Sequence, residues 1–420
     1  MSIAQRLLEL LQAGRYAEIR DLFAPNLRPM VTEDSLRAAW EAELDRHGPL
    51  TGAGEPLTEA ALVKLPVLFA HGAATVLLSV TESGWLTGLQ IAAAEAAQPT
   101  LPWQPPAYAD PDALAEHDVT VGSGPLAVPG TLTLPAGPGP HPAIVMLAGS
   151  GPNDRDETIG RNKPFKDLAW GLAARGIATL RFDKVTHAHG ASVKGLADFT
   201  VDDEYKPHAL AAVGLLRQHP AVDAGRVFVL GHSLGGTIAP RIAAAEPAVA
   251  GLVLLAGGAQ PLHWSAVRQF RHLASLNPAT SASYDQIIEA VTRQAHAVDS
   301  PDLSAATPIE DLPFGVPAAY WLDLRAYDPA TAAAGVDRPI LILQGARDYQ
   351  VTVADDLARW QAALAGRPDV TVHVYDADNH FFFPGEGPST PAEYEPVQHL
   401  DPAVVADIAA WVLDGRGATN

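Results

Sequence analysis

The fold is decided by one stretch of sequence, Val227-Phe228-Val229-Leu230-Gly231-His232-Ser233-Leu234-Gly235-Gly236. Four apolar residues typical of a buried strand lead into a G-x-S-x-G pattern, and an alanine-rich helical sequence follows it. A nucleophile elbow needs this order of strand, turn and helix, because Gly231 and Gly235 let the turn close around a strained serine. We therefore expect Ser233 to project above the strand ends. The alternative is a turn serine that only caps the next helix.

A serine hydroxyl becomes a useful nucleophile only when a base takes its proton and an acid orients that base. The apolar run 340–343 leads through a loop to Asp348, and the run 370–374 leads through another loop to His380. Both loops leave the carboxyl end of an expected strand. We interpret Ser233, His380 and Asp348 as a catalytic triad, against the alternatives of a turn aspartate and a surface histidine.

An acyl-transfer site also needs backbone N–H groups where negative charge develops on the substrate oxygen. One is expected from Leu234, which follows the nucleophile at the start of a helix. The other is expected from the loop after the first central strand, with Ser150 as the first choice and Gly149 as the alternative. These amides would form the oxyanion hole.

Strand and helix patterns alternate around the elbow from residue 105 to the C-terminus, which predicts a mostly parallel sheet covered on both faces. About eighty residues separate the strand runs 251–255 and 340–343, more than an ordinary crossover needs. We expect a helical cap insertion at about 258–335. The predicted strands are 119–121, 131–134, 143–147, 178–182, 227–230, 251–255, 340–343 and 370–374, and the predicted helices are 167–174, 208–217, 237–245, 354–364 and 403–413.

The first 104 residues follow a different pattern. Apolar spacing predicts one helix over about 7–22 and a second around 35–44, behind a cap at Thr32 or Asp34. Three strand-like runs come next, at 61–70, 74–79 and 85–92, with a turn at 82–84. The proline-rich segment 98–106 has the composition of a linker. We expect a small α+β domain over residues 1–104 and a second domain over 105–420.

Composition excludes several classes of function. The chain has 28 basic and 48 acidic residues, hence a net charge of −20, which argues against nucleic acid and against an anionic membrane surface. Cysteine is absent, so disulfides, thiolate nucleophiles and cysteine zinc sites are excluded. No apolar run has the length of a membrane span, and the first twenty residues are typical of an amphipathic helix rather than a signal peptide. A cytoplasmic protein is expected.

Five segments carry a resemblance to a known family: Gly149-Ser150-Gly151-Pro152-Asn153-Asp154-Arg155-Asp156, Arg181-Phe182-Asp183-Lys184, Gly231-His232-Ser233-Leu234-Gly235-Gly236, Tyr320-Trp321-Leu322-Asp323-Leu324 and Gly345-Ala346-Arg347-Asp348. With them, residues 115–420 resemble bacterial α/β-hydrolase-fold carboxylesterases, in the branch near dienelactone hydrolases and acyl-CoA thioesterases. Such relatives often carry H-G-S-G-P, and this chain has Ala148 where the histidine would be. The first hundred residues resemble a small cystatin-like or nuclear-transport-factor-like domain.

Other features have a structural and a functional interpretation. We prefer an ion-pair network for the charged residues at 154–156 and 183–184, with substrate selection as the alternative. His187 and His189 lack a third ligand at any motif spacing, so no metal site and no cofactor are expected. Cap aromatics could line an acyl pocket or form the cap core: Trp264, Phe270, Phe314, Tyr320 and Trp321.

These observations predict a carboxylesterase-type serine hydrolase that acts on small to medium acyl esters through an acyl-enzyme intermediate. The same triad would serve an acyl thioesterase or a peptidase. A binding or scaffold protein with an inactive hydrolase domain is the alternative from another class. A small-molecule ester is the expected partner, and residues 1–104 are expected to orient the protein, cover the cap or build a homodimer interface.

Overall fold

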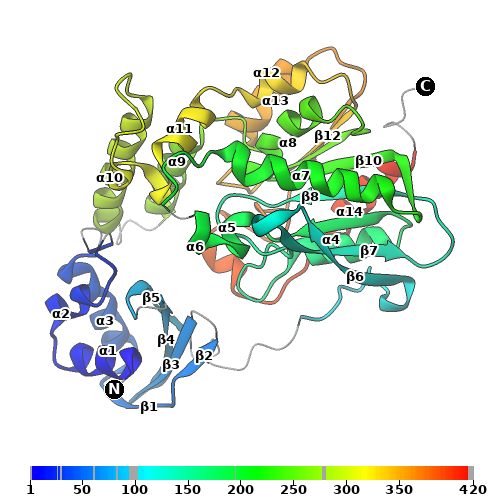
Figure 1. The fold of residues 1–420 in the computed structure, drawn as a ribbon. Coiled ribbons are helices and arrows are strands. Elements are labelled where there is room, and N and C mark those ends of the chain that lie inside the picture. The colour runs from blue at the N-terminus through cyan, green and yellow to red at the C-terminus, as the bar shows by residue number, and fades with distance from the viewer. Residues whose placement is uncertain are drawn as a thin grey trace. The chain divides into compact units, whose positions relative to one another are not determined.

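The computed structural model describes residues 2–25, 27–28, 31–59, 62–81, 84–93, 103–193, 195–276 and 281–414. The chain divides into two compact units, Met1–Pro102 and Trp103–Asn420 (Figure 1). This division lies two residues before the boundary expected at residue 104. Residues 98–102 of the expected linker, and residues 82–83 of the expected turn, lie outside the described residues.

Helices open the N-terminal unit. Gly14, with a φ of 66°, separates two helices where the apolar spacing predicts one over residues 7–22. The next helix begins after Thr32, whose hydroxyl accepts the backbone N–H of Ser35, so the first of the two expected caps is the one used. The helices are α1 (Ile3–Gln12), α2 (Tyr16–Asp21) and α3 (Glu33–His47).

An antiparallel sheet completes this unit. Its strands are β1 (Leu50–Ala53), β2 (Leu57–Glu59), β3 (Leu62–Phe69), β4 (Gly72–Val80) and β5 (Leu86–Ala93). They lie in the order β1-β3-β4-β5, and β2 also pairs with β3. Buried side chains from helices and strands, such as Leu7, Trp40 and Val76, form one core within the unit.

The second unit is built on an eight-stranded sheet, counted over the described residues. Its strands are β6 (Leu114–Val121), β7 (Val128–Pro135), β8 (His141–Leu147), β9 (Ala178–Phe182), β10 (Val222–His232), β11 (Leu252–Leu255), β12 (Ile340–Gly345) and β13 (Val370–Tyr375). Their order is β13-β12-β11-β10-β8-β9-β7-β6. All pairs from β13 to β9 are parallel, whereas β7 is antiparallel to both β9 and β6. The loops that follow β8, β10, β12 and β13 therefore leave one edge of the sheet.

Helices cover both faces of this sheet, because its central strands are apolar on both sides. Along β8, Val145 and Leu147 belong to one core cluster while Ile144 and Met146 belong to the other. The first cluster packs against α7 (Val201–Gln218), α8 (Leu234–Ala245), α12 (Pro329–Ala334) and α13 (Ala358–Ala363), and the second against α4 (Pro164–Ala173) and α14 (Pro402–Leu413). The mostly parallel, two-sided sheet predicted for the α/β-hydrolase fold is confirmed.

The cap insertion lies between β11 and β12. The long helices α9 (Leu262–Leu276) and α10 (Ser281–Asp299) pack together, and α11 (Ala318–Arg325) precedes α12 (Figure 1). Val298, Leu303, Leu312, Ala318 and Trp321 form a core of their own beneath these helices. Shorter elements of the unit are α5 (Val185–Ala188), α6 (Gly190–Val193) and the 3-10 turns at Pro111–Ala113, Gly124–Leu126, Ile309–Asp311, Pro313–Gly315 and Pro391–Tyr394.

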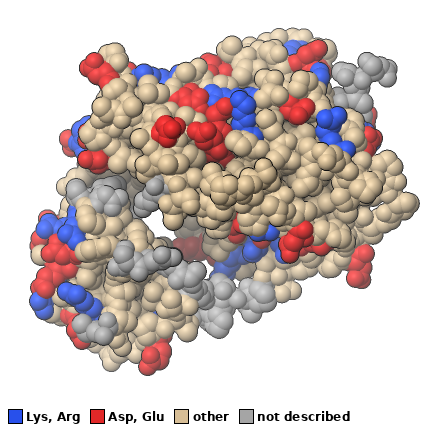
Figure 2. Space-filling model, viewed as in Figure 1, with Lys and Arg blue, Asp and Glu red and all other residues tan. Residues whose placement is uncertain are grey.

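Figure 2 shows the charged side chains on one face of the molecule. On this face, basic side chains lie among acidic ones rather than in a single patch. Within the described residues, no helix is both long enough and apolar enough to cross a membrane.

Candidate active site

Ser233 occupies a sharp turn between β10 and α8. Its backbone has a φ of 52° and a ψ of −119°, a conformation that non-glycine residues rarely adopt. A Cβ on Gly231 would lie 2.2 Å from the backbone of Gly235, and a Cβ on Gly235 would lie 2.1 Å from the carbonyl oxygen of Leu147. Neither glycine can therefore be replaced without opening the turn. This is the strained strand–turn–helix geometry of a nucleophile elbow.

Asp348 and His380 are brought together by the loops that follow β12 and β13. The Nδ1 atom of His380 lies 2.7 Å from Oδ2 of Asp348, and both side chains are almost completely buried. The other carboxylate oxygen of Asp348 accepts the backbone N–H groups of Gln350 and Val351, at 2.7 and 2.9 Å. With Asp348 fixed as an acceptor, Nδ1 of His380 carries the hydrogen, and Nε2 is left as the basic nitrogen.

The serine and the histidine are linked through the residue before the serine. The rings of His232 and His380 lie 4.7 Å apart between centroids, and Nε2 of His232 lies 3.0 Å from the carbonyl oxygen of His380. In the described part of the chain, no direct hydrogen bond joins Ser233 and His380. Catalytic hydrogen bonds of this kind are often long until substrate is bound.

The candidate oxyanion donors differ in availability. The N–H groups of Leu234 and Ser150 have no hydrogen-bond partner among the described residues. The N–H of Gly149, in contrast, donates to Oε1 of Glu157 at 2.6 Å. Leu234 and Ser150 are therefore open to a developing oxyanion, while the amide of Gly149 is already used.

The oxyanion loop is held by side chains from other elements, although Ala148 stands where the resembling family carries a histidine. The carbonyl oxygen of Gly149 accepts hydrogen bonds from Nζ of Lys184 and from the hydroxyl of Tyr205, both at 2.8 Å. The amide of Asn153 donates to the carbonyl oxygens of Gly149 and Ser150 at 3.1 and 3.0 Å. These contacts take over the side-chain support of the loop.

The charged residues near this loop form ion pairs, which agrees with the ion-pair network preferred for residues 154–156 and 183–184. Arg155 makes a two-pronged contact with Asp183, and Asp156 contacts Arg181 and Lys163. Burial of the Asp156 carboxyl raises its pKa, but the charges and hydrogen bonds of Arg181 and Lys163 outweigh that effect and leave its pKa below the usual value. The network braces the segment that follows the oxyanion loop.

Sequence reasoning missed Glu157 and its partner His232. The two side chains are buried, and Nδ1 of His232 lies 2.9 Å from Oε1 of Glu157. Burial lowers the pKa of His232, but the charge of Glu157, its hydrogen bond and the carbonyl of His380 raise the pKa to a net value above the usual one. One signal was present in the sequence: a histidine at the end of an apolar strand must be paired if it is buried.

The five cap aromatics differ in their contacts and burial. The hydroxyl of Tyr320 donates to Glu204 at 2.6 Å, and Trp321 is fully buried in the cap core. The indole N–H of Trp264 donates to Asp299 at 2.7 Å. Phe314 is 62% exposed, and Phe270 is half-buried on α9. Tyr320 and Trp321 therefore make structural contacts, and the assignment of the aromatics to an acyl pocket stays a prediction.

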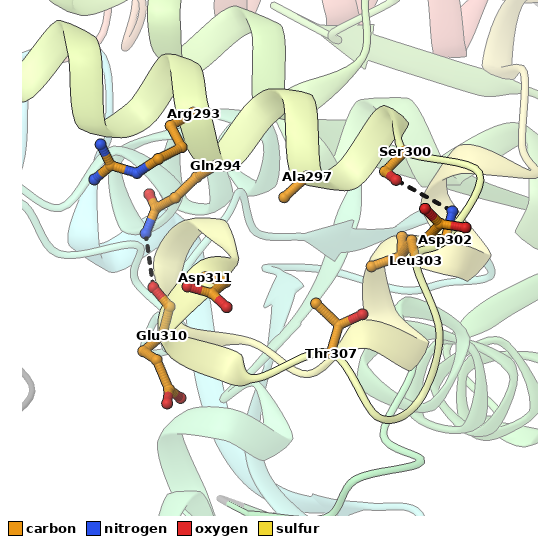
Figure 3. A pocket seen from close by; sticks show the side chains of 9 residues that line it. All are labelled: Arg293, Gln294, Ala297, Ser300, Asp302, Leu303, Thr307, Glu310 and Asp311. Atoms are coloured by element: carbon orange, nitrogen blue, oxygen red, sulfur yellow. Dashed lines mark hydrogen bonds between the residues drawn. The ribbon is translucent and has the colours of Figure 1, made fainter.

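A cavity of about 420 Å³ lies inside the cap (Figure 3). It is lined by Arg293, Gln294, Ala297, Ser300, Asp302, Leu303, Thr307, Glu310 and Asp311. Across it, Nε2 of Gln294 donates to the carbonyl oxygen of Glu310 at 3.3 Å. The lining includes none of the three residues expected to form a triad and none of the predicted pocket aromatics. Among the described residues, no group of three or more metal-ligating side chains is found.

Comparison with known proteins identifies relatives. A family model described as serine aminopeptidase, S33, matches residues 157–386. The chain is 34% identical to esterase EstD of Thermotoga maritima, over 96% of this chain and 93% of that protein. It is 31% identical to 2,6-dihydropseudooxynicotine hydrolase of Paenarthrobacter nicotinovorans, over 35% of this chain and 36% of that protein. The solved structure of Est1E from Butyrivibrio proteoclasticus is 15% identical with a TM-score of 0.45, covering 72% of this chain and 99% of that one.

Proposed function

Because the chain belongs to the α/β-hydrolase family described as serine aminopeptidase, S33, we propose that Ser233, His380 and Asp348 form the triad with which it hydrolyses carboxylic esters. The family makes it a serine hydrolase, and its 34% identity to an esterase over almost the whole chain makes ester hydrolysis its activity. The triad assignment is carried by the 2.7 Å contact between His380 and Asp348, on loops at the same sheet edge as the strained Ser233.

In the proposed mechanism, Nε2 of His380 takes the proton of Ser233 as the hydroxyl attacks the acyl carbonyl carbon. The N–H groups of Leu234 and Ser150 stabilise the tetrahedral oxyanion. His380 then gives the proton to the leaving alcohol, and an acyl-enzyme remains. Water attacks this intermediate with His380 again as the base, while Asp348 stabilises the imidazolium.

Labelling with a fluorophosphonate tests the nucleophile. The adduct should be found on Ser233 by mass spectrometry, and Ser233→Ala should lose labelling and on the order of 10⁶ in turnover, because the triad acts as a unit. Circular dichroism should show that this variant keeps its fold. Activity of Ser233→Ala within tenfold of the wild type would overturn the assignment.

The leaving group of the preferred substrate distinguishes an esterase from a thioesterase and from a peptidase. Transfer of an acyl group from oxygen, sulfur or nitrogen uses the same residues, and the matched family is described as an aminopeptidase family. A panel of aryl esters, thioesters and aminoacyl amides should give the highest kcat/KM for small to medium acyl esters. A preference for aminoacyl amides would favour a peptidase instead.

The location and assembly of the protein are also proposals. We propose that it acts in the cytoplasm, which cell fractionation tests. We propose that residues 1–104 orient the protein, cover the cap or build a homodimer interface. Light scattering measures the mass that distinguishes a dimer from a monomer.

A further inference from the structure

We propose that Glu157 and His232 are positioning residues, which hold the oxyanion loop and the carbonyl of the catalytic histidine in place as a buried ion pair. This inference rests on the proposed function, because it assigns the two residues a task in the same site. Neither residue touches the reacting atoms in the proposed mechanism. Their effect on the reaction rate would come from the positions that they give to Gly149 and His380.

The pair connects two loops and the end of a strand at the sheet edge. Oε1 of Glu157 accepts both the N–H of Gly149, at 2.6 Å, and Nδ1 of His232, at 2.9 Å. Nε2 of His232 donates to the carbonyl oxygen of His380 at 3.0 Å. The loop after β8, the end of β10 and the loop after β13 are thus joined through one carboxylate and one imidazole.

This geometry requires a charged His232. Beside an ionised Glu157, both ring nitrogens face oxygen atoms that only accept, and a neutral imidazole can donate from one nitrogen at a time. The groups packed around the ring support the charge: Glu157 lies against it, and Asp348 also raises the pKa of His232. The neighbouring titratable ring is that of His380. The uncharged rings of Phe165 and Phe381 complete the surroundings.

A second ion pair holds Gly149 through the peptide group on its other side. Nζ of Lys184 donates to the carbonyl oxygen of Gly149 and lies 3.1 Å from Glu204. Gly149 is thus bound through its N–H by Glu157 and through its carbonyl by Lys184. The carbonyl of Gly149 and the N–H of Ser150 belong to one planar peptide group, so fixing the carbonyl also fixes the direction of the Ser150 N–H.

Glu157 is itself held in an unfavourable conformation, with a φ of 51°. Its second carboxylate oxygen is buried and has no hydrogen-bond partner among the described residues. The backbone is equally tight at Gly149, where a Cβ would lie 3.0 Å from Glu157 and 3.1 Å from Ser233. Strain and an incompletely satisfied charge, gathered next to the nucleophile, are typical of a functional role rather than a purely structural one.

Glu157→Gln tests the proposal in the full-length protein. The amide keeps the shape but removes the charge, so His232 becomes neutral and one of its two hydrogen bonds is lost. We expect kcat to fall about 100-fold with little change in KM, because small misplacements of catalytic groups lower kcat by about this factor. In the wild type, kcat should also fall at alkaline pH as His232 loses its proton, and in the variant this fall should move to lower pH.

Asp167→Asn is the matched control. It neutralises a buried carboxylate that also faces a histidine, His399, but touches neither Gly149 nor His232. It should leave kcat and the alkaline fall in place. A Glu157→Gln variant with kcat within tenfold of the wild type and an unshifted alkaline fall would overturn the proposal.

A measurement on the wild-type protein covers the case in which Glu157→Gln fails to fold. Nitrogen-15 shifts of the His232 ring, assigned by their loss in His232→Gln, should show hydrogen on both nitrogens at about pH 7. A neutral ring would overturn the ion pair. The nitrogen-15 measurement does not depend on catalysis. If the fluorophosphonate fails to label Ser233, the proposed function is wrong, but the charge on His232 is still decided by the nitrogen-15 shifts alone.

Discussion

Asp348 shows how a single carboxylate fixes the base of the proposed triad. Its two oxygens together accept hydrogen bonds from His380, Gln344 and the backbone N–H groups of Gln350 and Val351. An asparagine would keep the shape and the backbone contacts. It would also present an N–H group to Nδ1 of His380 and so favour the wrong tautomer.

We therefore expect Asp348→Asn to lower kcat by about 10⁴ while the fold persists. The comparison is with Asp323→Asn and Asp328→Asn. Asp323 pairs with Arg241, and Asp328 caps α12. Initial rates with an aryl ester measure all three variants. A larger loss in either comparison variant than in Asp348→Asn would mean that the acid is wrongly assigned.

A second acid near the site should affect stability rather than catalysis. Burial raises the pKa of Asp378 to about 7, with a further contribution from the carboxylate of Asp401. An unfolded aspartate titrates near ~3.9, so the folded state favours the protonated acid. The corresponding stabilisation is present below about pH 4 and is lost as the pH rises through about 7.

Asp378→Asn removes this titration. Relative to the wild type, the free energy of unfolding of the variant should rise between about pH 4 and pH 8 by on the order of 3 kcal/mol. Urea unfolding at the two pH values measures the change. The exposed neighbour Asp376 offers the control, because Asp376→Asn should show no such difference. An equal effect of Asp378→Asn at both pH values would contradict the prediction.

At the scale of residues, the sequence predicts those site residues whose position follows from the order of the strands. Ser233, Asp348 and His380 each follow an apolar strand, and parallel strands bring such loops to one edge. Glu157 could not be found in this way. It lies among other charged residues in a loop, and its partner His232 is 75 positions away. Nothing local indicates that a carboxylate would be buried against the amide of Gly149.

At the scale of elements, the central strands and helices are predictable, and their ends are less so. The helix expected at 208–217 begins at Val201, since Thr200 and Asp203 form a capping box and Pro207 is tolerated inside the helix. The helix expected at 354–364 begins with a π-helical turn at Val353–Leu357. The strands β1 and β2 escaped detection because they have only 4 and 3 residues. Periodicity needs more residues than that to be seen.

The contact between α11 and α7 gives the cap a link to the oxyanion loop. Tyr320 on α11 donates to Glu204 on α7, and Glu204 pairs with Lys184, which holds Gly149. All three side chains are buried. Of the two roles considered for Tyr320, in an acyl pocket or in the cap core, these contacts favour a structural one.

Tyr320→Phe distinguishes the two roles. Loss of the hydroxyl leaves an oxygen of Glu204 without its donor and should destabilise the protein by about 1–3 kcal/mol. Because the aromatic ring remains, the preference among acyl chain lengths should not change. Thermal unfolding and a series of aryl esters of increasing chain length provide the measurements. A changed chain-length preference at unchanged stability would instead place the hydroxyl in the substrate pocket.

At the scale of the whole molecule, the two units have separate hydrophobic cores. Among the described residues, the fully buried core of the N-terminal unit comes from between Ala4 and Leu86, and the buried core clusters of the second unit come from between Val121 and Val412. The residues of the proposed triad and oxyanion hole all belong to the second unit. Folding of that unit should therefore not require the first.

The point of truncation matters, because Trp103 belongs to the second unit. Its indole N–H donates to the buried Asp167 at 2.8 Å, and its ring packs against Trp170. We expect a chain of residues 103–420 to fold and to be labelled at Ser233 as fast as the full-length protein. A chain that starts at residue 105 lacks this contact. It should unfold at a lower temperature, because it leaves the Asp167 carboxylate with one partner fewer.

Light scattering on the chain of residues 103–420 shows whether a dimer is lost with residues 1–102. If that chain folds but is no longer labelled, residues 1–102 contribute to the site, and the division of labour proposed for the two units is wrong.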